Sequence, residues 1–213
     1  MADLDLIAQH VVDGDADAVS RLVKAALDTG VAPEAVLEAG LTAGMTVVGR
    51  RFRDNEIFVP EVLVSARAMK AGLAHLEPIL SASGVKPVGT CVLGTVRGDI
   101  HDIGKNLVSM MLRGAGFTVV DLGVNVPAQA FVDAALEHQA ELVGMSALLT
   151  TTVVQMGPNV EALHAGAPGV RILVGGAPVT PEFAADIGAD GYGANAADAV
   201  DRALALVGRW KAG

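Results

Sequence analysis

An aspartate and a histidine two residues apart, Asp99 and His101, are the pair in this chain best suited to metal chemistry. In an extended loop, side chains at such spacing point to the same side. A carboxylate that accepts a hydrogen bond from one imidazole nitrogen fixes the tautomer and leaves the other nitrogen as a metal ligand. On spacing alone, the simpler interpretation is an exposed histidine beside a helix-capping aspartate such as Asp102.

Glycines flank this pair and recur later in the chain. Gly98 and Gly104 leave room for a wide, flat ligand over the loop. Gly175 and Gly176 form an adjacent pair that removes side chains where a ligand tail could enter. A tight turn explains this second pair equally well.

Four hydroxyl groups lie within residues 146–152, directly after another apolar segment. Ser146 is predicted to hydrogen-bond Asp99 across the mouth of a common cleft. Helix capping is the preferred interpretation of Thr151 and Thr152.

The elements that must position these residues fall into two parts. The first part has helical periodicity, and we expect a small bundle with helices over 4–12, 15–28, 33–52 and 60–76. The polar stretch 81–84 is predicted to be a flexible linker. It divides a helical domain, 1–83, from a second domain, 88–213.

The second part alternates between strand and helix patterns. The expected strands are 88–96, 118–122, 142–145, 171–174 and 191–192. The expected helices are 103–112, 128–137, 151–164, a short one near Pro181, and 197–207. This alternation predicts an α/β fold with a doubly wound, flavodoxin-like, five-stranded parallel sheet. Ligands of such sheets bind beyond the carboxyl ends of the first and third strands, where Asp99, His101 and Ser146 are placed.

Composition excludes several classes of function. The net charge of −9 and an aromatic content of 3% argue against binding to nucleic acid. No apolar stretch is long enough for a membrane span, and the N-terminal residues are acidic where a signal peptide would be basic. The single cysteine, Cys91, fits a reducing compartment. We therefore expect a cytoplasmic protein.

Three motifs occur together in this order: Asp-x-His-x-x-Gly at 99–104, Ser-x-Leu at 146–148 and Gly-Gly at 175–176. In this combination the chain resembles the cobalamin-binding module of methionine synthase. It is similar also to the small corrinoid proteins of methylamine, methanol and methoxyaromatic methyltransferase systems. Residues 38–41, 44–49, 58–60 and 65–69 resemble the helical cap of that family. The resemblance covers nearly the whole chain.

The resemblance implies a cobalamin or related corrinoid cofactor whose cobalt is ligated from below by His101. Asp99 and Ser146 would form a relay behind the histidine. Phe52 and Val59, the latter where methionine synthase has leucine, would cover the upper face. The positions that the resemblance assigns to the cofactor are Glu38, Phe52, Val59, Gly98, Asp99, Ile100, His101, Asp102, Ile103, Gly104, Ser146, Leu148, Thr150, Gly175, Gly176 and Ala196.

The implied function is that of a methyl carrier, which alternates between methylcob(III)alamin and cob(I)alamin and has little turnover of its own. Its implied partners are a substrate-specific methyltransferase, a second methyltransferase that methylates the acceptor, and a reductive activase. Three alternatives stay open: an adenosylcobalamin-binding subunit of a mutase, a non-catalytic B12 sensor, and a scaffold without cofactor. The methyl donor stays open as well.

Overall fold

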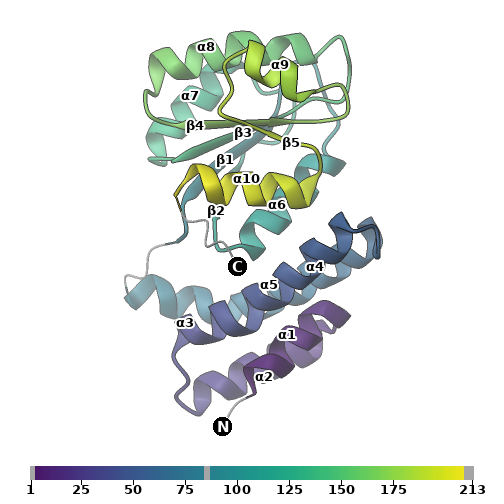
Figure 1. The fold of residues 1–213 in the computed structure, drawn as a ribbon. Helices are drawn as coiled ribbons and strands as arrows, with labels where there is room; N and C mark the ends of the chain where they lie inside the picture. The colour runs from purple at the N-terminus through teal and green to yellow at the C-terminus, as the bar shows by residue number, and fades with distance from the viewer. Residues whose placement is uncertain (1–2, 84–86, 209–213) are drawn as a thin grey trace. The chain divides into compact units, whose positions relative to one another are not determined.

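The computed structural model describes residues 3–83 and 87–208, which form two compact units (Figure 1). The first, here called the helical unit, is made up of described residues within 1–86 together with the short segment 114–116. The second, the sheet unit, contains the other residues from 87 onward. None of the described helices is long and apolar enough to cross a membrane.

Helices alone build the helical unit. They are α1 (Leu4–Asp13), α2 (Ala16–Asp28), α3 (Pro33–Ala35), the π-helix η1 (Val36–Thr42), α4 (Ala43–Arg53) and α5 (Val59–Ser83). Gly14 ends α1 with a left-handed φ of 73°, and Asp15 then caps α2 by accepting a hydrogen bond from the Ala18 amide. The buried side chains include Ile7, Val19, Val23, Leu41, Val48, Val62 and Leu76.

The single helix expected over 33–52 is wrong in detail, because the chain there passes from α3 through the π-helix η1 into α4. This stretch packs closely against α1: a β-carbon at Gly44 would lie 2.7 Å from the Ala8 carbonyl oxygen. The apolar periodicity does not reveal the wider π turns, since the buried face continues through them.

The linker expected over 81–84 is also corrected. Residues 81–83 belong to the last turn of α5, and Gly84 lies outside the described residues. Serine and alanine are compatible with a helix end, so composition alone placed this boundary too early.

Five parallel strands form the sheet, in the order β2-β1-β3-β4-β5. They are β1 (Thr90–Thr95), β2 (Thr118–Asp121), β3 (Leu142–Ser146), β4 (Arg171–Gly175) and β5 (Gly191–Gly193). The register places Cys91 of β1 between Val119 of β2 and Leu142 of β3. Since β2 and β3 lie on opposite sides of β1, the predicted doubly wound topology is confirmed. The loops that follow β1 and β3 therefore meet at one edge.

Helices cover both faces of this sheet. They are α6 (Ile103–Gly114), α7 (Ala128–Glu137), α8 (Met156–Gly166) after the short 3-10 turn η2 (Val153–Gln155), α9 (Pro181–Asp186) and α10 (Ala196–Leu206). Figure 1 shows α7 and α8 on one face, and α6 and α10 on the other. Phe131 of α7 is fully buried, and a β-carbon at Gly94 would lie 2.9 Å from its ring. Gly94 thus lets α7 pack directly on β1.

Candidate functional site

The loop between β1 and α6 brings the histidine to the carboxyl edge of the sheet. A turn closes this loop through a 3.1 Å hydrogen bond from the Asp99 amide to the Val96 carbonyl. Gly98 within the turn has a φ of 83°, in the left-handed region that favours glycine. The side chain of His101 follows the turn and is 46% exposed.

Asp99 is fully buried and accepts hydrogen bonds at both carboxylate oxygens. Oδ1 accepts from the backbone amide of His101 at 3.0 Å and from its Nδ1 at 2.7 Å. Oδ2 accepts from the Leu148 amide at 2.8 Å and from the Thr152 hydroxyl at 2.6 Å. Burial raises the pKa of Asp99, but these hydrogen bonds together outweigh it and hold that pKa well below its usual range.

The state of the imidazole follows from this arrangement. An ionised carboxylate only accepts hydrogen bonds, so Nδ1 of His101 must carry a proton and donate it. In a neutral ring that donates from Nδ1, the lone pair lies on Nε2, and the side chain is half-exposed. This is the tautomer that a metal-ligating histidine requires, with its second nitrogen fixed by a carboxylate.

The structure corrects the hydroxyl expected behind the histidine. No hydrogen bond joins Ser146 to Asp99 in the described structure; the hydroxyl that bonds Asp99 belongs to Thr152. Thr152 also makes no side-chain cap bond to η2, so its interpretation as a helix cap is wrong. The sequence could have narrowed the choice to the four hydroxyls, but the turn over residues 149–152 decides which one faces the carboxylate.

Most of the other predicted residues of the sheet unit lie around this loop. Asp102 immediately precedes α6, and its carboxylate accepts a 3.0 Å hydrogen bond from the Asn106 side chain. A β-carbon at Gly104 would meet no atom within 4 Å, so the space there is open as expected. Exposed apolar side chains belong to the histidine loop, to the first residue of α6 and to the loop after β3: Ile100, Ile103, Leu148 and Leu149.

The ends of β3 and β4 hold the next group of predicted residues. Ser146 is in register with Gly175, and a β-carbon at Gly176 would lie only 1.9 Å from the Ala147 carbonyl oxygen. The Gly176 carbonyl also accepts a hydrogen bond from the Val179 amide, which closes a turn. The glycine pair therefore both forms a turn and lets two backbone segments approach closely. Thr150 is exposed in the loop after β3, and Ala196 is buried at the start of α10.

Three predicted residues belong to the helical unit instead. Glu38 is exposed within η1, Phe52 is half-buried in α4, and Val59 is the first residue of α5. Their contact with a cofactor stays a prediction.

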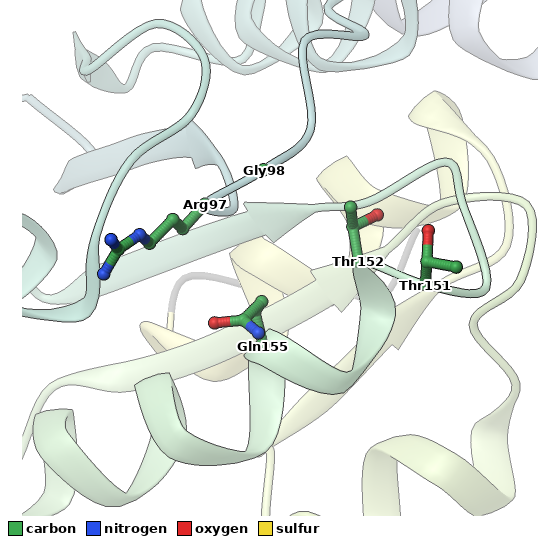
Figure 2. A pocket seen from close by; sticks show the side chains of 5 residues that line it. All are labelled: Arg97, Gly98, Thr151, Thr152 and Gln155. Carbon is green, nitrogen blue, oxygen red and sulfur yellow. The ribbon is translucent and has the colours of Figure 1, made fainter.

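A cleft of about 390 Å³ opens beside the histidine loop and was not foreseen. Figure 2 shows the side chains that line it. They are Arg97, Gly98, Thr151, Thr152 and Gln155. Thr152, which donates its hydroxyl to Asp99, is also one of the residues that line this cleft.

The donor set fits the cobalt of a corrinoid. No cluster of three or more metal-ligating side chains occurs within residues 3–83 and 87–208. A corrinoid would bring its own nitrogen ligands for the cobalt, so the single imidazole of His101 would suffice as the ligand from the protein. The exposed apolar side chains of the histidine loop, of α6 and of the loop after β3, and the open space at Gly104, would suit a broad macrocycle.

Comparison with known families matches residues 89–201 to a B12 binding domain and residues 4–77 to a second model of that description. The chain is 42% identical over 214 residues to a corrinoid protein of Desulfitobacterium hafniense, covering 98% of this chain and 99% of that protein. It is 44% identical over 201 residues to trimethylamine corrinoid protein 1 of Methanosarcina mazei, covering 92% and 93%.

A solved structure supports the same relationship. The methanol:cobalamin methyltransferase complex MtaBC of Methanosarcina barkeri matches with a TM-score of 0.83 and 34% identity, over 95% of this chain and 78% of that chain. A cobalamin-binding protein of Desulfitobacterium hafniense matches with a TM-score of 0.80 and 33% identity, over 97% and 99%. The resemblance carried by the three motifs is thereby confirmed, and this chain belongs to the B12-binding corrinoid proteins.

Proposed function

We propose that this chain binds a corrinoid at the carboxyl edge of its sheet and carries a methyl group on the cobalt between two methyltransferases. The observation that supports this best is the 2.7 Å hydrogen bond from Nδ1 of His101 to the buried Asp99. The corrinoid, when bound, supplies a cobalt centre that accepts and donates methyl groups. The protein supplies orientation and electrostatics.

The lower side of the cofactor would be held by the sheet unit. Nε2 of His101 would ligate the metal, and the carboxylate of Asp99 would keep the imidazole in the ligating tautomer. Thr152 takes the place proposed earlier for Ser146 in supporting that carboxylate. The nucleotide tail would lie against Ser146 and the glycine pair 175–176, where side chains are small or absent.

The helical unit would act as the cap. We propose that residues 1–83 form this cap domain and residues 88–213 the cofactor-binding domain. Phe52 and Val59 would shield the upper face of the ring, and Glu38 and Ala196 would make further cofactor contacts. Apolar shielding of this kind protects a reactive group from water.

The first partner would be a methyltransferase that acts on a methylated substrate. The similarity to a chain of a methanol:cobalamin methyltransferase complex supports this. A second methyltransferase for the acceptor and a reductive activase complete the proposed set. Mass spectrometry of proteins that co-purify with the tagged chain should identify members of these classes. We further propose a cytoplasmic location, in keeping with the one buried free cysteine.

The lower ligand is tested by absorption spectroscopy of the protein loaded with methylcobalamin. The native protein should show histidine-ligated cobalt, and His101→Ala should lose that spectrum. His138→Ala is a matched control, since His138 is an exposed histidine of the sheet unit at the C-cap of α7. An unchanged spectrum in His101→Ala, or equal losses in both variants, would contradict the assignment.

A further inference from the structure

We infer that Asn125 is a positioning residue for the histidine loop, an inference that rests on the proposed function of that loop. Asn125 lies in the segment between β2 and α7, beside the loop that follows β1. Its backbone φ is 57°. This left-handed region is uncommon for residues other than glycine, and asparagine tolerates it better than most.

Two hydrogen bonds connect Asn125 to both ends of the dipeptide 98–99. Its side-chain Oδ1 accepts from the Gly98 amide at 2.8 Å. Its own amide donates to the Asp99 carbonyl at 2.9 Å. The next residue, Val126, continues the contact as a parallel bridge to Val96. One residue thus holds the backbone of the turn from the side of β2.

The carboxylate of Asp99 is held separately, from the side of β3. There the Leu148 amide and the Thr152 hydroxyl donate to Oδ2. The Asp99 amide also donates to the Val96 carbonyl, and the Thr95 hydroxyl donates to the His101 carbonyl. The bond between Asp99 and the imidazole therefore depends on a backbone to which Asn125 contributes two of the hydrogen bonds, and on a side chain held by the loop after β3. Releasing the backbone should loosen the 2.7 Å bond that sets the tautomer of His101.

Substitutions at Asn125 separate the hydrogen bond from the backbone conformation. Asn125 is exposed, so its variants are expected to fold. Asn125→Gly keeps the left-handed φ without strain but removes Oδ1, whereas Asn125→Ala loses Oδ1 and is strained as well. Asn125→Asp retains an acceptor and should restore the native behaviour. Gln139→Ala is the matched control, because Gln139 is another exposed left-handed residue of the sheet unit, with a φ of 48°.

Two readouts are measured on the full chain. In the cofactor-free protein, NMR follows hydrogen exchange of the Gly98 amide and the proton on Nδ1 of His101. In the protein loaded with methylcobalamin, absorption at one fixed pH gives the ratio of histidine-ligated to unligated cobalt. Loss of one hydrogen bond should change this ratio by about two- to tenfold.

We expect both readouts to change in Asn125→Gly and Asn125→Ala, to recover in Asn125→Asp, and to stay native in Gln139→Ala. Native values in Asn125→Gly, or equal changes in Gln139→Ala, would overturn the inference. If the wild-type loaded protein showed no histidine ligation, the proposed function would fail. The NMR readout of the cofactor-free protein would still decide whether Asn125 holds the loop.

Discussion

Replacing Thr152 by valine removes one oxygen from the support of the histidine and leaves the shape of the side chain almost unchanged. Thr152 is 7% exposed, and its hydroxyl donates to the fully buried carboxylate of Asp99 at 2.6 Å. Hydrogen bonds to a charged group contribute about 1.5–3 kcal/mol. The remaining bond from the Leu148 amide keeps Oδ2 partly satisfied, so we expect Thr152→Val to lower the free energy of unfolding by about 2 kcal/mol near neutral pH.

The pH dependence of this loss follows from the lowered pKa of Asp99. A carboxyl whose pKa is lower in the folded than in the unfolded state stabilises the protein at pH values above the unfolded pKa of about 3.9. That contribution is lost as the pH falls through the lower, folded-state pKa. The difference between native protein and Thr152→Val should therefore be constant near neutrality and shrink in acid below about pH 4.

Urea denaturation of the cofactor-free protein, followed by circular dichroism, measures this difference. Thr151→Val is a control for the same change at an exposed neighbour, and Ser146→Ala tests the hydroxyl that sequence alone selects. We expect both controls to stay within about 0.5 kcal/mol of the native protein. An effect of Ser146→Ala larger than that of Thr152→Val, or no effect of Thr152→Val, would refute the reasoning.

Three further predictions concern the sheet unit. Burial raises the pKa of the Cys91 thiol to about 12, so iodoacetamide should leave native Cys91 unmodified at about pH 8 and alkylate it after denaturation. The neutral thiol should also stabilise the folded protein below its unfolded-state pKa of about 8.5. That contribution should be lost as the pH rises through the pKa of the thiol in the folded protein. Gly176→Ala should destabilise by about 2–5 kcal/mol, because its β-carbon would meet the carbonyl oxygen behind it, while Gly169→Ala, also at positive φ but in open space, should lose only about 1 kcal/mol in the same denaturation assay. Lys105, whose side chain is 2% exposed, pairs with the less buried Asp121, so Asp121→Ala should lower the melting temperature more than Lys105→Met does; the reverse order would contradict this account.

The predictions from sequence succeeded where periodicity and parallel-strand topology determine position. Alternating strand and helix patterns placed residues 97–102 at the carboxyl edge. The spacing of Asp99 and His101 allowed a hydrogen bond between them, and the family resemblance then implied it; the structure contains it. The placement and the spacing both rely on regular geometry. The same topology places the glycine pair 175–176 at the end of β4. Only the structure shows how closely Gly176 approaches the Ala147 carbonyl oxygen.

The predictions failed where irregular backbone determines which side chain reaches the site. Ser146 and Thr152 are chemically equivalent candidates, and the turn between them selects the second. Asn125 carries no motif, because its role requires a left-handed conformation and the adjacency of β2 to β1 in space. Neither the left-handed conformation nor the adjacency of the strands produces a periodic pattern in a single sequence.

The direction of the imidazole is determined by three strands of one sheet rather than by a single loop. The loop after β1 provides His101 and Asp99, the segment after β2 holds the backbone through Asn125, and the loop after β3 holds the carboxylate through Thr152. All of these contacts join protein groups to one another, and none of them uses a group of the cofactor. Preorganisation of this kind strengthens binding by reducing its entropic cost. Loosening any of the three contacts should therefore weaken corrinoid affinity even where the metal ligand itself is intact.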